Sequence, residues 1–174
     1  HIMRRRQRQM CIRDRLDPAT TMGAMVDVNH AKKVEEFLNV GKAEAKLITG
    51  GDRFSINDSD AFIQPTIFAD VSEDATIARD EIFGPVLAIQ TFDTEDEAIK
   101  MANKSIYGLA ASVWTSDLAR AMDLSDKLHV GTVSVNTVDA LSAMTPFGGM
   151  KQSGFGRDLS IPVSYTHLRA HETG

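Results

Sequence analysis

The chain has 174 residues, of which 43% are hydrophobic, and a formal net charge of −5. This length suits one domain or most of one, and the hydrophobic share is sufficient for a core. No apolar run approaches the roughly 18 residues of a membrane-spanning helix, and the acidic balance argues against a nucleic-acid surface, which needs clustered Lys and Arg.

The two ends differ in composition from the rest of the chain. Residues 1–15 carry six arginines against one acidic residue, and residues 161–174 lack any helical or strand period. A nucleic-acid arm or a targeting segment is an alternative for the head, but it has neither the apolar segment of a secretory signal nor the serines of a transit peptide. We interpret both ends as foreign to the domain, the head as disordered, and residues 16–160 as the domain.

Cys11 is the only cysteine, so the chain forms no intrachain disulfide. A reducing, cytoplasmic setting is therefore expected. A catalytic cysteine needs a positioned base in a structured pocket. The neighbouring arginines would favour the thiolate of Cys11, but a disordered head offers no such pocket, so Cys11 is not predicted to be a nucleophile.

In the first half of the domain, the sequence predicts one long helix and short strands. The helix runs from near residue 28 to near residue 44, because Val34, Phe37 and Leu38 form an apolar stripe. A short strand follows at 46–49, and residues 52–60 are polar and turn-like. Residues 62–69 contain Pro65, which predicts an edge or irregular strand.

A short helix at 73–79 leads into a corner at residues 80–89 with the sequence DEIFGPVLAI. Gly84 permits backbone angles that other residues resist, and Pro85 pushes Gly84 out of the helical region. By spacing alone this is a helix-to-strand turn. The alternative is a corner that holds the Glu81 carboxylate and the Phe83 ring at the edge of a sheet.

The second half alternates strands and helices. Strands are predicted at 86–92, which is apolar enough to be buried, at 108–115 and at 132–136. The helix at 94–104 begins with a capping box, Thr94 and Glu97, and Ser116 or Asp117 caps the next helix. The βαβαβ order predicts an α/β fold with a largely parallel sheet flanked by helices. Ligands bind at the carboxyl ends of such strands, where Asn136 lies.

The loop at 136–157 is long enough to be functional. Lys151 does not follow the glycine pattern of a phosphate-binding P-loop, and Leu159 stands where a dinucleotide fingerprint needs its third glycine. We expect the loop to line a cavity with Phe147 and small residues. No histidine has companions at metal-ligand spacing, and His30 and Lys33 on the first helix are consistent with a solvated face.

Four motifs in register resemble the NAD(P)-dependent aldehyde dehydrogenase superfamily, and the resemblance spans residues 17–160, almost all of the domain. They are EIFGPV at 81–86, YGLAA at 107–111, GTVSVN at 131–136 and PFGGMKQSG at 146–154. Within the superfamily, residues 17–23 and 135–142 look most similar to the γ-glutamyl-γ-aminobutyraldehyde dehydrogenases of putrescine breakdown. The resemblance implies part of a catalytic domain that takes NAD or NADP and an aldehyde.

The resemblance also implies residue roles at the cofactor. Glu81 matches the carboxylate that binds the nicotinamide-ribose hydroxyls, as an acceptor-only group can, and Phe83 matches the aromatic beside the nicotinamide. His30 and Lys33 fall near the adenosine ribose.

For the substrate, Asp139, Leu141 and Phe147 fall on the family's tunnel wall. Leu141 replaces an aromatic residue of many relatives, which would widen the tunnel or favour an aliphatic aldehyde.

The family's nucleophilic Cys, its glutamate base, its oxyanion-hole Asn and its dinucleotide-binding domain match no part of this chain. We therefore expect a fragment that is inactive alone, from a full-length homo-oligomer, dimer or tetramer, with no nucleic-acid or membrane partner. The alternative is a non-catalytic domain that binds a partner or a subunit.

Overall fold

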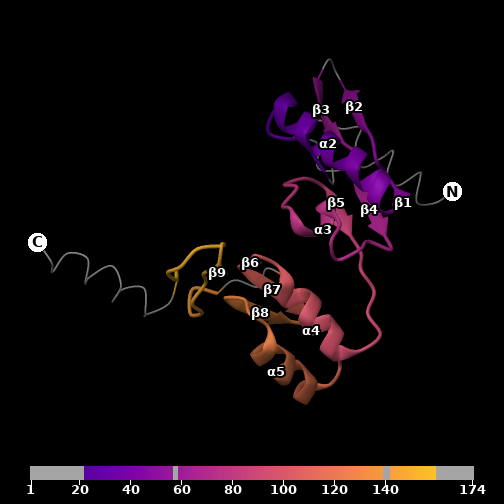
Figure 1. Ribbon diagram of the computed structural model, residues 1–174. Coiled ribbons are helices and arrows are strands. Elements are labelled where there is room, and N and C mark those ends of the chain that lie inside the picture. Colours follow the sequence, from indigo (N-terminus) through magenta and orange to yellow (C-terminus); the bar gives the residue numbers. More distant parts are fainter. Residues whose placement is uncertain (1–21, 57–58, 139–141, 160–174) are drawn as a thin grey trace, which may run out of the picture. The chain divides into compact units, whose positions relative to one another are not determined.

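The computed structural model describes residues 22–56, 59–138 and 142–159 (Figure 1). Internal contacts divide the chain into two units, residues 1–91 and 92–174. The predictions for the head, for the tail and for Cys11 lie outside the described residues, and so do those for Asp139 and Leu141.

Helix α2 (Val28–Glu44) begins and ends as the sequence predicts. The Asp27 side chain caps it by accepting a hydrogen bond from the backbone N–H of His30 at 2.7 Å. Val34 and Leu38 are fully buried, together with Ala31 one turn earlier. Phe37, which we placed in the same stripe, is only half-buried.

A three-stranded sheet in the first unit has the order β1-β4-β5, with β1 (Lys46–Thr49), β4 (Thr66–Ala69) and β5 (Val86–Ala88). β4 is antiparallel to β1 and parallel to β5. Of the prediction of an edge or irregular strand at 62–69, the edge part is wrong, because β4 is central, whereas the irregularity is real, because the run is divided between the end of β3 (Ser59–Ile63) and β4. Pro65 lies just before β4, where its missing N–H removes no hydrogen bond from the ladder.

Residues 52–60 are not simply a turn. β2 (Arg53–Ile56) and β3 (Ser59–Ile63) form an antiparallel pair, with Phe54 opposite Phe62 and ring centroids 5.7 Å apart. Cross-strand aromatic pairs of this kind stabilise a hairpin. Nε of Arg53 donates to Oε2 of Glu35 at 2.7 Å and ties the pair to α2.

The core of the first unit lies between α2 and the strands beside it (Figure 1). Phe68 of β4 is fully buried there. Short helix α3 (Thr76–Arg79) adds Ile77 to this core, and its first residue donates two hydrogen bonds to the Glu44 carboxylate at the end of α2.

The strand at 86–92 is shorter and more exposed in the structure than the buried strand that the sequence predicts. It ends at Ala88, and Leu87 is 54% exposed. Val86 and Ala88 pack against the core while Leu87 does not, as the two-residue period of a strand at the surface requires.

The second unit contains α4 (Glu95–Lys104), β6 (Tyr107–Gly108), β7 (Ala110–Val113), α5 (Leu118–Lys127), β8 (Thr132–Val135) and β9 (Met150–Lys151). Thr94 caps α4 by accepting from the N–H of Glu97 at 3.2 Å, while the Glu97 carboxylate accepts from Asp93 N. Asp117 caps α5. Both predicted helix starts are confirmed.

β7, α5 and β8 form a βαβ unit with parallel strands, and β6 pairs antiparallel with β9. The fold is therefore α/β. The single, largely parallel sheet is not confirmed, because within the described ranges only the pairs β4–β5 and β7–β8 are parallel and they belong to different sheets. No helix in the described part of the chain is long and apolar enough to span a membrane.

Candidate functional site

The corner at residues 80–85 joins the end of α3 to the start of β5. Asp80 N bonds to Thr76 O at 2.9 Å and Pro85 O accepts from Thr66 N at 2.8 Å, so both ends of the corner are fixed by backbone hydrogen bonds. Ile82 packs against the core, whereas its neighbours Glu81 and Phe83 are exposed. The corner therefore presents a carboxylate and an aromatic ring to the outside.

Phe83 holds an unusual backbone conformation. Its φ is 53°, in the left-handed region, and its side chain is 71% exposed. A non-glycine residue pays about 1–2 kcal/mol for this conformation, and such residues persist where surrounding contacts fix them. The exposed ring supplies few such contacts, so the backbone must be held by other groups.

One of these groups is the side chain of His30. Its Nε2 lies 2.6 Å from the carbonyl oxygen of Phe83, 53 positions along the chain. A carbonyl oxygen only accepts, so Nε2 carries the proton and donates it. The structure thus brings together two residues that the sequence analysis assigned to the same cofactor.

A second contact holds the same corner against α2. A Cβ built on Gly84 would lie 2.8 Å and 2.9 Å from the two γ-carbons of Val34, which is fully buried. His30 and Val34 are four residues apart, so they lie on the same face of the helix. Only glycine lets the corner approach this closely.

The other predicted site residues lie on three different segments of the chain. Lys33 is exposed on α2, three residues after His30, and Glu81 is exposed on the corner. Phe147 is half-buried and belongs to the second unit. Glu81 and Lys33 thus lie in the first unit and Phe147 in the second.

The loop that carries Phe147 is closed on itself by backbone hydrogen bonds. Phe147 and Asp158 form an antiparallel bridge, with N–H to O distances of 2.8 Å and 2.6 Å. Nη1 of Arg157 donates to Gly149 O at 2.8 Å. A Cβ on Gly131 would collide with Gly148 O, so this loop packs directly against the backbone before β8.

Two polar residues that the sequence analysis considered only as possible ligand contacts help to order the second unit. Asn136, with φ of 54°, accepts from Thr115 N and donates to Thr115 O, both at 2.9 Å, which joins the ends of β7 and β8. Lys151 donates from Nζ to Asn103 O and Ser105 O at the end of α4. An Asn directly after a strand was a signal for the first, whereas Lys151 was considered only as a phosphate ligand.

The described ranges contain no cluster of three or more His, Cys, Asp or Glu that could hold a metal ion. In the part of α5 that carries Asp123 and Lys127, the pKa of Lys127 is raised by its hydrogen bond to the Asp123 carboxylate. It lies outside the candidate site.

Comparison with curated proteins identifies relatives at high identity. The family model described as "Aldehyde dehydrogenase family" matches residues 1–170. A betaine aldehyde dehydrogenase of Agrobacterium fabrum is 48% identical over 96% of this chain and 35% of its own length. The NADP/NAD-dependent aldehyde dehydrogenase PuuC of Escherichia coli is 47% identical over 88% of this chain and 31% of its own length.

Solved structures of aldehyde dehydrogenases are similar to this chain as well. A γ-glutamyl-γ-aminobutyraldehyde dehydrogenase of Burkholderia cenocepacia is 46% identical, with a TM-score of 0.84 over 89% of this chain and 31% of that one. The indole-3-acetaldehyde dehydrogenase AldA of P. syringae, in complex with NAD+, is 44% identical, with a TM-score of 0.82 over 85% of this chain and 30% of that one.

The chain spans about a third of the curated relatives' length, 36% of the first of them. The family match and the shared fold lead to one conclusion: the chain belongs to the aldehyde dehydrogenase family.

Proposed function

We propose that the chain supplies the nicotinamide side of the cofactor site in an enzyme that oxidises an aldehyde to a carboxylic acid and reduces NAD or NADP. One observation carries the proposal: Glu81 and Phe83 are exposed on a corner whose backbone is bound to α2 through His30. The AldA structure in complex with NAD+ supports this assignment by similarity.

The residues present fit a nicotinamide nucleotide. An exposed carboxylate accepts hydrogen bonds and donates none, so Glu81 can take both hydroxyl protons of a ribose and fix its orientation. The exposed Phe83 ring offers an apolar face beside which a planar heterocycle packs. NAD(P)+, when bound, accepts the hydride, and the chain's own residues orient it. His30 and Lys33 of α2 remain proposed neighbours of the adenosine ribose.

The substrate part of the proposal rests on similarity. An aliphatic aminoaldehyde, as in putrescine degradation, fits the replacement of an aromatic residue by Leu141, and Asp139 and Phe147 complete the proposed tunnel wall. Betaine aldehyde is the competing substrate, since several relatives carry that name. The choice between NAD and NADP belongs to residues outside this chain.

We further propose that these residues alone do not oxidise aldehydes. The resemblance places the nucleophilic cysteine, the glutamate base and the dinucleotide-binding domain outside this chain. We expect the full-length protein to be a cytoplasmic homo-oligomer whose catalytic domain contains a largely parallel sheet flanked by helices.

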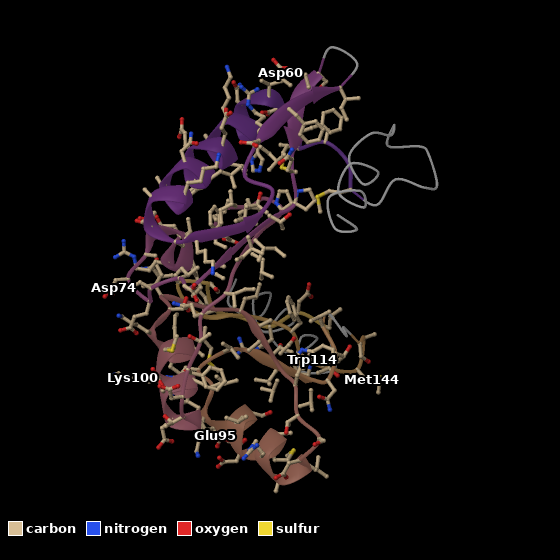
Figure 2. All side chains as sticks on the ribbon, turned by 90° about the vertical axis from the view of Figure 1, so that its right-hand side faces the viewer. Asp60, Asp74, Glu95, Lys100, Trp114 and Met144 are labelled. Atoms are coloured by element: carbon tan, nitrogen blue, oxygen red, sulfur yellow. The ribbon has the colours of Figure 1, made fainter. Side chains whose placement is uncertain are left out.

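A non-catalytic domain that binds a partner or a subunit is the second candidate. It is favoured by exposed apolar side chains in the second unit, among them Trp114 at 66% and Met144 at 80% exposure (Figure 2). Surfaces of this kind mark interaction sites in soluble proteins. The same exposure follows from the first proposal if the rest of the enzyme covers these residues.

The decisive experiment is to express the complete reading frame and assay it against a panel of aldehydes with NAD+ and with NADP+. Glu81→Gln should weaken cofactor use, while Glu36→Gln, an exposed change on α2, should leave it unchanged. Equal cofactor use by both variants would refute the role of Glu81. NADH production by the isolated chain that survives Cys11→Ala would refute the proposal that essential groups lie elsewhere.

A further inference from the structure

The bond between His30 and Phe83 assigns His30 a role other than contact with the cofactor. Nε2 of His30 donates to the Phe83 carbonyl at 2.6 Å, and Phe83 has φ of 53°. We propose that His30 is a positioning residue, which acts through the Phe83 backbone to hold the exposed aromatic ring and the adjacent Glu81 in place. This inference rests on the proposed cofactor site.

Hydrogen-bond capacity favours this role over direct recognition of a ribose. A histidine has one proton on Nε2 at most, and here the carbonyl takes it. Nε2 therefore cannot accept a hydrogen bond from a ribose hydroxyl, and only Nδ1 remains for any ligand. The backbone N–H of His30 is also engaged, because it donates to the capping Asp27 side chain at 2.7 Å. The His30 backbone is thus fixed by the helix cap, and the tip of its ring by Phe83.

The second contact to α2 restricts where the corner lies but not how the Phe83 peptide is turned. Gly84 packs against the buried side chain of Val34 through apolar contact alone, which has little directionality. A hydrogen bond to a carbonyl oxygen does have a preferred direction. The His30 bond is therefore the contact that selects the orientation of the Phe83 peptide, while Gly84 and Val34 set its distance from the helix.

The first test concerns this chain and does not depend on any activity. NMR with 13C and 15N labels measures the Phe83 carbonyl shift, the backbone coupling that reports φ of Phe83, and the coupling across the bond to Nε2 of His30. We expect His30→Ala to remove the cross-bond coupling and change the coupling that reports φ. His30→Gln should keep the Phe83 conformation, because its amide also donates. His129→Ala, at an exposed histidine of the second unit, is the matched control.

An unchanged Phe83 conformation in His30→Ala would overturn the proposal, whatever the full-length protein does. If folding fails in His30→Ala, His30→Gln and His30→Leu still separate the roles, since both keep a large side chain and only Gln donates.

The second test uses the full-length enzyme and the split between kcat and KM. A misplaced ring slows the hydride step, so His30→Ala should lower kcat about tenfold, with a smaller change in KM for the nucleotide. His30→Gln should restore kcat to within about threefold, and His129→Ala should match the wild type. A raised KM with kcat unchanged would show direct contact with the nucleotide and overturn the positioning role.

The two tests also separate this inference from the proposed function. A full-length protein that oxidises no aldehyde refutes the proposed function, and refutes the role of His30 in catalysis with it. The NMR result would then still report whether His30 sets the conformation of Phe83.

Discussion

The two units of the chain are stabilised differently. Of the buried apolar side chains in the described ranges, all but Ala121 belong to residues 1–91. In residues 92–174, Leu118 is 75% exposed and Phe155 fully exposed, and local order there comes from hydrogen bonds such as the pair between Asn136 and Thr115. The first unit therefore carries its own apolar core, whereas the second depends on hydrogen bonds.

The largest expected effect is at the centre of the first core. Phe68→Ala removes a fully buried ring and should lower the free energy of unfolding by about 3–5 kcal/mol. Urea denaturation followed by circular dichroism measures it. The matched control is Phe155→Ala, which removes an exposed ring and should change little. Equal losses in the two variants would break the contrast between the units.

A smaller effect is expected where the corner meets this core. Gly84→Ala places a Cβ within 3 Å of the γ-carbons of Val34 and should cost about 1–3 kcal/mol by overpacking. The double variant with Val34→Ala should recover part of this loss, which a double-mutant cycle in urea quantifies. Gly23→Ala is the control, because no heavy atom lies within 4 Å of its Cβ position. Strict additivity of the two changes would contradict the close approach.

In the second unit, the corresponding test replaces Asn136, whose side chain and positive φ both contribute to local order. Asn136→Ala removes two hydrogen bonds and leaves Ala at φ of 54°, whereas Asn136→Gly removes only the bonds. The exposed bonds should be worth about 1 kcal/mol together, and the Ala variant should lose about 1 kcal/mol more through strain. Hydrogen exchange of amides in β7 and β8 measures both. Identical protection in the two variants would rule out a contribution from the backbone conformation.

The sequence predicted the elements whose signals are local. α2, α4 and α5 were found because apolar periodicity and capping residues such as Asp117 and Thr94 act within a few positions. The pairing of β2 with β3 was missed because it depends on contacts across the hairpin. The central place of β4 was missed because Pro65 was taken to lie inside the strand rather than before it.

The candidate site was predicted as residues but not as a geometry. Motif resemblance selected His30 and Phe83 separately, yet nothing local indicates that a histidine side chain on α2 binds a carbonyl 53 positions later. The left-handed φ of Phe83 was equally hidden, since a phenylalanine carries no preference for it. Long-range hydrogen bonds and strained backbone angles arise from the assembled fold.

The smallest expected effect concerns the surface of α5 and its dependence on pH. Nζ of Lys127 donates to Oδ2 of Asp123 at 2.6 Å, four residues earlier, and this hydrogen bond raises the pKa of Lys127 above the ordinary 10.5. A pKa raised in the folded state means that the pair stabilises the folded chain fully below pH 10.5, and that this contribution disappears as the pH rises through the folded-state pKa. Both groups are about half exposed, so solvent and salt screen the pair and its effect is small.

Lys127→Met should therefore lower the Tm slightly at neutral pH and low salt, and the difference from wild type should vanish well above pH 10.5. Lys100→Met, at an exposed lysine of α4, is the control for loss of a positive charge (Figure 2). A difference that persists at high pH would mean that Lys127 stabilises α5 through its aliphatic chain, and that even the outer face of the second unit relies on apolar packing rather than on polar contacts.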